Sequence, residues 1–328
     1  MTRPRRPALG LKTYSHLSRE RRLPSDYELV TSELLYYPKR GFEVQTPLQG
    51  WYDEHQRRSP LTVPDWERFR DPRETTYATY TALASERETY VDGTLSSIEE
   101  TDYDKELSTE WRTLIERVVA PLRFPVHGLQ MVSAYVGQMA PSGRITVAAA
   151  FQTADEVRRI QRVAYRMAQL SMTDPMFGKE SRDSWQKDEI WQPLREAVER
   201  CLVAYDWGEA FVALNVCIKP VIDELFMVHL PKVAKDHGDY LLGQIFSSLN
   251  EDCKWHRDWA AALLTTAVRD RPGNRDVIAG WVDRWRPIAL AAAAPFGFLF
   301  PEAARVEERL ADVTTDLLRR ADLGWAAK

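Results

Sequence analysis

The chain has 328 residues, of which 44% are hydrophobic and 28% charged, enough apolar material for one large domain or two closely packed ones. Forty-four basic residues against 48 acidic ones give a net charge of −4, which excludes a global positive field for nucleic acid. Cys201, Cys217 and Cys253 are too few and too scattered for a disulfide framework, so they favour a reducing, cytoplasmic compartment. The apolar stretches are too short or too interrupted to span a bilayer, and we expect a soluble protein.

Residues 1–70 carry Pro, Tyr and Trp without a sustained period, which predicts an extended N-terminal arm. The arm opens with the basic clusters MTRPRRP and SRERR and continues into LLYYPKRGFEVQTPLQGWY, which has more aromatic residues than a solvated tail holds. We therefore expect the arm to lie on an acidic surface of a partner subunit. Residues 71–328 then form the folded domain.

After residue 70 a 3.6-residue period dominates and no convincing alternating strand appears, which predicts an all-α fold of long helices. Asp, Ser and Asn stand near several helix starts, and prolines stand near the junctions. The predicted helices span residues 72–99, 107–119, 122–139, 143–173, 180–204, 207–229, 238–270, 274–292 and 301–322. Paired tryptophans along them are predicted to anchor packing or interfaces, because no basic groove accompanies them.

Polar residues fall on the core-facing side of the predicted helix 143–173. A projection at 100° per residue places Glu156 inward with Arg159 on its flank, and it places Arg158 and Arg162 on the solvent side. The simplest interpretation of Glu156 and Arg159 is an internal ion pair three residues apart.

Two further helices carry inward polar residues. Cys253 and His256 share the apolar stripe of 238–270, and Glu209 lies in a segment that is apolar on nearly all sides, so we expect Glu209 to be buried. A hydrogen-bonded core histidine and a gap-filling cysteine are the simplest interpretations of His256 and Cys253. A zinc site of Cys253, His256 and Glu209 is the alternative, although it lacks a predicted fourth ligand.

These inward residues form the layout of a di-iron helical bundle with half of its ligands missing. Such a site takes about four carboxylates and two imidazoles, partly as Glu-x-x-His. None of the six histidines follows a glutamate by three residues, and Arg159, which does, has no lone pair for a metal. An alternative is a metal-dependent helical oxidase that uses Glu156, Glu209 and His256. A helical adaptor without an oxygenase partner is a further alternative.

Five stretches make the chain resemble the β subunit of the hydroxylase component of the soluble di-iron multicomponent monooxygenases of the toluene, phenol, alkene and isoprene type. They are LKTYSHL near the start, WERFRDPRETTYATY at 66–80, FQTADEVRRIQRVAYR at 151–166, FGKESRDSWQKDEIWQPLREAVERCLVAYDWGEAF at 177–211 and GDYLLGQIFSSLNEDCKWHRDW at 238–259. The last stretch is also similar to a helix of the catalytic α subunit, in which the residues matching Cys253 and His256 are a ligating Glu and a ligating His.

The resemblance implies a ferritin-like bundle, similar to the small subunit of ribonucleotide reductase, that has lost its di-iron site. In it Glu156 matches a ligand position, Arg159 and Cys253 replace a His and a Glu, and Glu209 falls near another ligand. The resemblance also implies a non-catalytic structural β subunit of an (αβγ)₂ hydroxylase, with the di-iron centre in α, that oxidises small alkenes or aromatics with O₂ and NADH-derived electrons. An effector protein, a Rieske ferredoxin and a flavin reductase are the further implied components, without nucleic acid or membrane.

Overall fold

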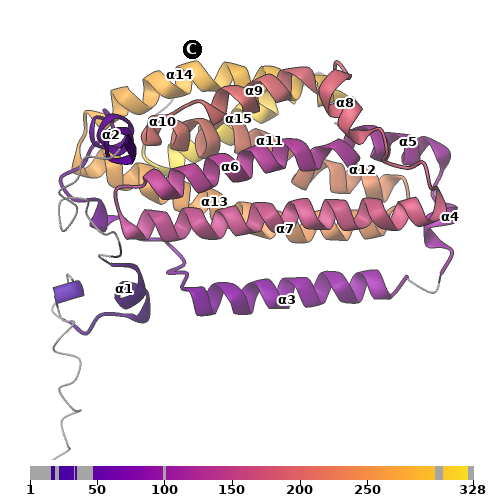
Figure 1. Cartoon of the computed structure of the whole chain (residues 1–328), viewed down its shortest axis with the longest axis horizontal. Helices are drawn as coiled ribbons and strands as arrows, with labels where there is room; N and C mark the ends of the chain where they lie inside the picture. The colour runs from indigo at the N-terminus through magenta and orange to yellow at the C-terminus, as the bar shows by residue number, and fades with distance from the viewer. Residues whose placement is uncertain are drawn as a thin grey trace, which may run out of the picture.

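The computed structural model describes residues 16–18, 22–32, 34, 47–98, 101–299 and 306–323. Within these ranges every regular element is a helix, so the prediction of an all-α fold is confirmed, and the helices form a layered bundle (Figure 1). No helix of the described ranges is both long and apolar enough to cross a membrane. The α-helices are α1 (Asp26–Thr31), α2 (Pro47–Tyr52), α3 (Tyr77–Ser96), α4 (Tyr103–Glu106), α5 (Thr109–Val118), α6 (Arg123–Met139), α7 (Gly143–Thr173), α8 (Ser181–Lys187), α9 (Gln192–Leu202), α10 (Trp207–Phe211), α11 (Lys219–Asp223), α12 (Leu230–Asp236), α13 (Tyr240–Asp270), α14 (Asn274–Ala293) and α15 (Val306–Arg320).

Six short helical segments of other types lie between residues 53 and 299 of the described ranges. The π-helical segments are η2 (Asp53–Arg57), η5 (Val212–Ile218) and η6 (Glu224–His229), and the 3₁₀ segments are η3 (Trp66–Arg68), η4 (Ala120–Leu122) and η7 (Ala294–Leu299). Two π segments flank α11, and each ends shortly before a proline: η5 before Pro220 and η6 before Pro231. A proline has no backbone N–H to donate to the preceding turn. A π turn holds an extra residue, so the side chains that follow it rotate away from the direction that a 3.6-residue period predicts.

The two longest helices, α7 and α13, have 31 residues each and organise the bundle. The side chain of Ser142 caps α7 by accepting from the N–H of Arg144, and Asp239 caps α13 by accepting from Leu242. Figure 1 shows α6 lying beside α7 over most of its length, with α13 behind. Gly137 lets α6 and α7 approach closely, because a Cβ there would lie 3.2 Å from the Cβ of Ala149.

The predicted helix 180–204 is two helices, α8 and α9, and 207–229 is the series α10, η5, α11 and η6. The break between α8 and α9 is made by buried Trp191, whose Nε1 donates to the carbonyl of Arg117 at 3.0 Å, and by Pro193 in the first turn of α9. Predicted helix 72–99 begins only at Tyr77, because Thr76 caps it and Asp71 accepts from the N–H groups of Arg73 and Thr75. The first residues of predicted helix 301–322 lie outside the described residues.

Helix α3 runs alongside α7 (Figure 1), and ion pairs join it to the side of α7 that the projection assigned to solvent. Arg158 pairs with Glu88 of α3 and, at 2.7 Å, with Asp252 of α13, and Arg162 pairs with Glu88 and, at 2.7 Å, with Asp92 of α3. The prediction that Arg158 and Arg162 face solvent is therefore wrong. A single-face projection fails for α7 because this helix has neighbours on two sides.

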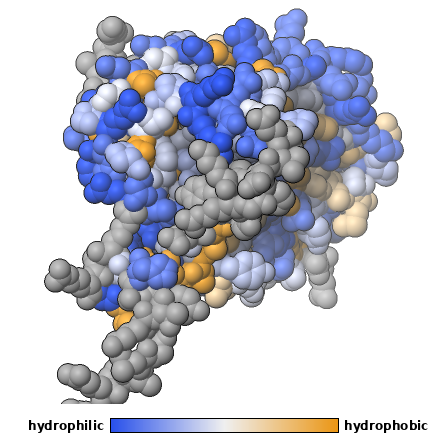
Figure 2. Space-filling view, turned by 60° about the vertical axis from the view of Figure 1, so that its left-hand side comes forward, coloured by the Kyte–Doolittle hydropathy of each residue, from blue (hydrophilic) through white to orange (hydrophobic). Residues whose placement is uncertain are grey.

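The described part of the predicted arm packs on the chain's own bundle. Tyr52 Oη donates to the carbonyl of Gln138 at 3.0 Å, Gln56 Nε2 donates to Met139 at 2.8 Å, and Ser59 Oγ lies 2.9 Å from Asp206. Contact between the arm and a partner subunit remains a prediction, and much of the arm before residue 47 lies outside the described residues. Figure 2 shows this end of the molecule as largely hydrophilic, with apolar side chains in small groups.

Candidate functional site

Four charged side chains meet between α7, α11 and α13, and we call them the buried quartet: Glu156, Arg159, Lys219 and Asp223. Arg159 Nη1 lies 3.2 Å from Glu156 Oε2 and 3.1 Å from Asp223 Oδ1. Lys219 Nζ lies 3.0 Å from Glu156 Oε1 and 2.8 Å from Asp223 Oδ2. The four side chains are each at most 2% exposed. Two buried cations thus face two buried carboxylates, and the formal charges of these four side chains cancel.

The two carboxylates of the quartet differ in how they are held. Asp223 accepts hydrogen bonds from Arg159 at 3.1 Å and from Lys219 at 2.8 and 3.0 Å. Glu156 lies within ionic distance of the same two cations, but neither of its oxygens has hydrogen-bond geometry. Asp223 is therefore the better-anchored anion, and Glu156 depends on the positive charge around it.

Charge pairing keeps Lys219 and Asp223 ionised. Burial and the nearby Arg159 act to lower the pKa of Lys219, but the carboxylates of Asp223 and Glu156 raise it above its usual value. Burial acts to raise the pKa of Asp223, and Lys219 and Arg159 outweigh it, so the pKa lies below its usual value. Breaking a pair of this kind leaves an uncompensated buried charge.

Cys253 of α13 lies against the quartet, in contact with Arg159. Arg159 Nη2 donates to Cys253 Sγ at 2.7 Å, and the thiol itself donates to the carbonyl of Leu249 at 3.4 Å. Burial raises the pKa of the Cys253 thiol to about 11, although Arg159 acts to lower it. The thiol is therefore neutral, and it leaves the charge balance of the quartet unchanged.

His256 lies one turn further along α13 but is bonded away from the quartet. Its Nε2 lies 2.9 Å from Asp155 Oδ2, while Asp155 Oδ1 accepts from Tyr80 of α3 at 2.9 Å. Burial, with Lys219 and Arg159 nearby, holds the pKa of His256 well below its usual value, so the imidazole is neutral and its Nε2–H donates to Asp155. Burial also raises the pKa of Asp155 to about 6.

The structure brings together Glu156, Arg159 and Cys253, as the sequence predicts, but it places Glu209 elsewhere. Glu209 Oε1 lies 2.6 Å from Arg284 Nη1 and 3.0 Å from Trp285 Nε1, and its side chain is 18% exposed. The expectation that Glu209 is buried is therefore wrong, because its side chain is partly exposed and pairs with Arg284. The π segment η5 rotates the helix after α10, so that later residues turn towards α7.

The residues that take the place of Glu209 are Lys219 and Asp223, which sequence reasoning missed. A signal for them was present: Lys219 and Asp223, four residues apart, interrupt the mostly apolar stretch VALNVCIKPVID. Charges so spaced in an apolar helix indicate a buried pair that requires further partners.

The quartet fits a metal ion poorly. Arg159 and Lys219 have nitrogen atoms within 3.2 Å of both carboxylates, and neither cation offers a lone pair to a metal. In the part of the chain that the structure describes, no three His, Cys, Asp or Glu side chains are grouped so that they could hold one. The structure does not bring Glu209 together with Cys253 and His256, nor with Glu156 and His256, so the zinc and oxidase alternatives lack their sites.

The bundle of long helices, with charged side chains buried between α7, α11 and α13, is of the ferritin-like class of helical proteins. Comparison with solved structures agrees. A chain in the structure titled "Toluene bound in the resting active site of toluene 4-monooxygenase" matches with a TM-score of 0.83 and 36% identity, over 91% of this chain and 99% of that one. A chain of xenon-pressurised phenol hydroxylase from Pseudomonas sp. OX1 matches with a TM-score of 0.88 over 98% of each chain, and at 20% identity it supports the fold alone.

Sequence comparison assigns the family. Residues 51–271 match the family described as Methane/Phenol/Alkene Hydroxylase. The chain is 38% identical over 293 residues to the toluene-4-monooxygenase hydroxylase component subunit beta of Ectopseudomonas mendocina, covering 87% of this chain and 89% of that protein. It is 26% identical to the propane 2-monooxygenase hydroxylase small subunit of Rhodococcus jostii (strain RHA1), covering 88% and 80%. The chain belongs to the methane, phenol and alkene hydroxylase family, as a β subunit of the hydroxylase component of di-iron monooxygenases.

Proposed function

We propose that this chain is the non-catalytic structural β subunit of an (αβγ)₂ hydroxylase whose α subunit holds the di-iron centre. The observation that supports this proposal is the buried quartet. Its two cations neutralise the negative charges of Glu156 and Asp223, which a pair of metal ions would otherwise neutralise. The role of this chain is then to support the helices of α and not to take part in the reaction. The charge-balanced quartet lets the bundle keep its form without metal.

The substrate proposed for the whole complex is a small aromatic or alkene, oxidised with O₂ and electrons derived from NADH. Relatives named for toluene, propane and phenol support small hydrocarbons and phenols, and the relative at 38% identity is named for toluene. An effector protein, a Rieske ferredoxin and a flavin reductase are the proposed further components, acting in the cytoplasm. The names of the relatives, which describe a hydroxylase component of a system, support a multicomponent assembly.

The test separates metal content from assembly. The chain is coexpressed with its α and γ subunits, and iron per protomer and turnover per iron are measured for wild type and for the double variant Glu156→Leu/Arg159→Met. This variant removes one anion and one cation and leaves the pair of Lys219 and Asp223 balanced. We expect iron content and turnover per iron within about twofold of wild type.

A parallel measurement uses the wild-type chain purified by itself. Elemental analysis is expected to find no stoichiometric iron, manganese or zinc. One tightly held metal per chain that is lost in His256→Ala, or turnover per iron abolished in an assembled double variant, would show that this chain takes part in the chemistry.

A further inference from the structure

Three polar side chains inside the bundle have atoms without a hydrogen-bond partner in the described part of the chain. These atoms are Nε2 of Gln152, both amide atoms of Asn215 and both carboxylate oxygens of Glu156. The exposed fractions of the three residues are 0%, 3% and 0%. A buried donor or acceptor without a partner is costly, because it loses its hydrogen bonds to water and gains none.

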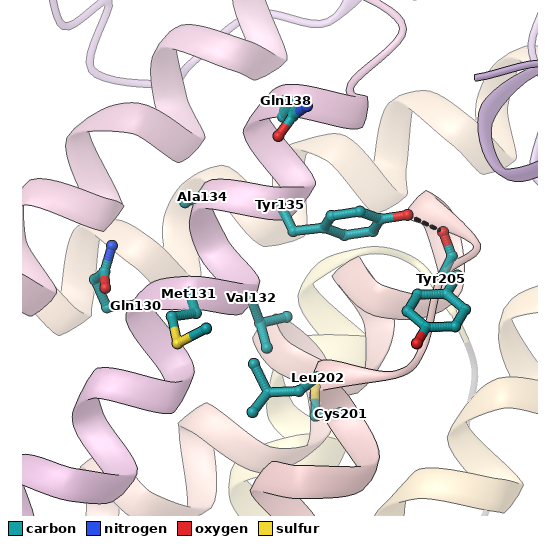
Figure 3. Close-up of a pocket in the computed structure, with 9 residues that line it drawn as sticks. All are labelled: Gln130, Met131, Val132, Ala134, Tyr135, Gln138, Cys201, Leu202 and Tyr205. Carbon is teal, nitrogen blue, oxygen red and sulfur yellow. Dashed lines mark hydrogen bonds between the residues drawn. The ribbon is translucent and has the colours of Figure 1, made fainter. Parts of the chain in front are cut away.

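Polar side chains at the surface differ, because solvent reaches them. Figure 3 shows a pocket of about 350 Å³ between α6 and residues 201–205. At its edge Tyr135 Oη donates to the carbonyl of Tyr205 at 2.6 Å, and the side chain of Gln138 is exposed. An amide such as that of Gln138 can bond to bulk water, whereas the amides of Gln152 and Asn215 cannot.

The quartet fixes the register between α7 and the series of η5 and α11. Lys219 of α11 lies 3.0 Å from Glu156 of α7, and the other two members of the quartet pair one turn further along both segments. The two segments therefore run side by side in the same direction. Asn215 precedes Lys219 by four residues, and Gln152 precedes Glu156 by four. Residues four apart lie on one side of an α-helix, and a π turn shifts them only slightly.

Trp259 of α13 supports this register. Its Nε1 donates to Gln152 Oε1 at 3.0 Å, and its ring lies 5.4 Å from that of Phe211, centroid to centroid. Phe211 precedes Asn215 by four residues, so the indole contacts both segments. The bond also fixes the orientation of the Gln152 amide, because an indole N–H can only donate. Gln152 and Asn215 thus share one layer of the core, next to the quartet.

The unpaired atoms of this layer define the ligand that would satisfy them. Gln152 offers a donor, Glu156 offers acceptors and Asn215 offers both. The formal charges of the quartet cancel, so the ligand has to be neutral. Water is a neutral molecule that donates and accepts, and a buried water typically makes about three hydrogen bonds to groups that otherwise lack partners.

We propose that Gln152, Asn215 and Glu156 bind an internal water molecule beside the quartet. The water accepts from Gln152 Nε2, donates to a carboxylate oxygen of Glu156 and pairs with the amide of Asn215. It supplies Glu156 with the hydrogen bond that Arg159 and Lys219 do not make. The water therefore anchors the less firmly held carboxylate of the quartet. This site belongs to the core of the chain and does not depend on an α subunit.

The direct test is a crystal structure of the full chain, with any subunits that copurify with it, at a resolution that shows ordered waters. We expect a water oxygen within about 3.2 Å of Gln152 Nε2, of one amide atom of Asn215 and of one Glu156 oxygen. A direct hydrogen bond between the two amides, or a layer without water, overturns the proposal. A metal ion at this place, identified by anomalous scattering, overturns both this proposal and the proposed function.

Thermal unfolding provides a second measurement. Asn215→Leu removes both amide atoms and roughly keeps the shape of the side chain. We expect the unfolding midpoint to fall by about 2 to 4 °C, because the water that pairs Gln152 and Glu156 loses a partner. A midpoint above that of wild type overturns the proposal, since removal of a dry, unpaired amide is stabilising. If the variant does not fold, the crystal structure of the wild-type chain decides.

The matched control is Gln138→Met, which removes an amide that bulk solvent reaches. Its midpoint should stay within about 1 °C of wild type, as is usual for a surface substitution. A fall as large as that of Asn215→Leu would mean that loss of any amide is destabilising, and it would remove the support that unfolding gives to the proposal.

Discussion

Lys219 Nζ on α11 lies 3.0 Å from Glu156 Oε1 on α7, and both side chains are at most 2% exposed. Glu156 therefore has a second cation besides Arg159, its neighbour on the same helix. The ion pair that the sequence suggests is half of a network that joins two helices. The effect of removing one of the four charges therefore depends on the net charge that the other three keep, and not on one broken contact.

Arg159→Ala should destabilise the chain by about 3 to 5 kcal/mol, because two buried carboxylates are then left with one cation. Glu156→Leu/Arg159→Met should recover much of that loss, since the remaining Lys219 and Asp223 balance each other. Denaturant unfolding of the three chains measures both effects. Arg195→Ala, which breaks an exposed pair with Glu199 on α9, is the control and should change stability by less than about 0.5 kcal/mol. A double variant as unstable as Arg159→Ala would contradict the charge-balance argument.

The buried neutral His256 should make the chain sensitive to mild acid. Its pKa in the folded chain lies well below the usual 6.5, so below pH 6.5 the unfolded chain binds a proton that the folded chain does not. The free energy of unfolding then falls with falling pH, by up to about 1.4 kcal/mol per pH unit from this group. Asp155 acts in the opposite direction. Its pKa in the folded chain is raised to about 6, so the folded chain binds its proton more tightly than the unfolded chain does. The stability that this proton contributes at low pH is lost as the pH rises towards 6.

The comparison of wild type with His256→Gln isolates the histidine, because Gln can still donate to Asp155 and both chains keep that carboxyl group. Unfolding free energies between pH 7.5 and 5 should fall more steeply for wild type than for the variant. Equal slopes would show that His256 has the same pKa in the folded chain as in the unfolded chain.

Helix α3 should be the part of the bundle that detaches most easily. Val91 and Leu95 are its only buried residues, and it is held largely by ionic contacts such as those of Arg162 with Glu88 and Asp92. Arg162→Met should speed the hydrogen exchange of residues 77–96 by roughly three- to tenfold, while the amides of α13 stay protected. Arg195→Met on α9 serves as the control. Exchange that rises equally in α3 and α13 would mean global destabilisation and not local release.

Gly128 should be intolerant of a methyl group. A Cβ at this position of α6 would overlap Cγ1 of Val198 on α9, so Gly128→Ala should destabilise by about 1 to 3 kcal/mol. Gly93→Ala on α3 is the matched control, because a Cβ there has nothing within 4 Å, and it should stabilise by about 0.5 to 1 kcal/mol. Val198→Ala should restore part of the loss in Gly128→Ala. A neutral Gly128→Ala would show that α6 and α9 can move apart.

Sequence periodicity was enough to predict the all-α fold, the bounds of α7 and, within a few residues, those of α6, α13 and α14. It also placed Glu156, Arg159 and Cys253 on inward faces. These features are local: apolar spacing along one helix and capping residues at its ends determine where it begins and which side it buries. The resemblance to hydroxylase β subunits was likewise carried by short stretches that are read residue by residue.

Tertiary structure decided which charges share a site. The π segment η5 separates Glu209, which pairs with Arg284, from Lys219 and Asp223, which lie against α7. Helix α3 covers Arg158 and Arg162 on a side that a projection assigns to water. Neither outcome follows from a 3.6-residue period, because a π turn changes the period and a second neighbour changes which face is buried. The balance of two cations and two carboxylates is a property of packing, since the free energy of each charge depends on the others that the fold places within 3.2 Å.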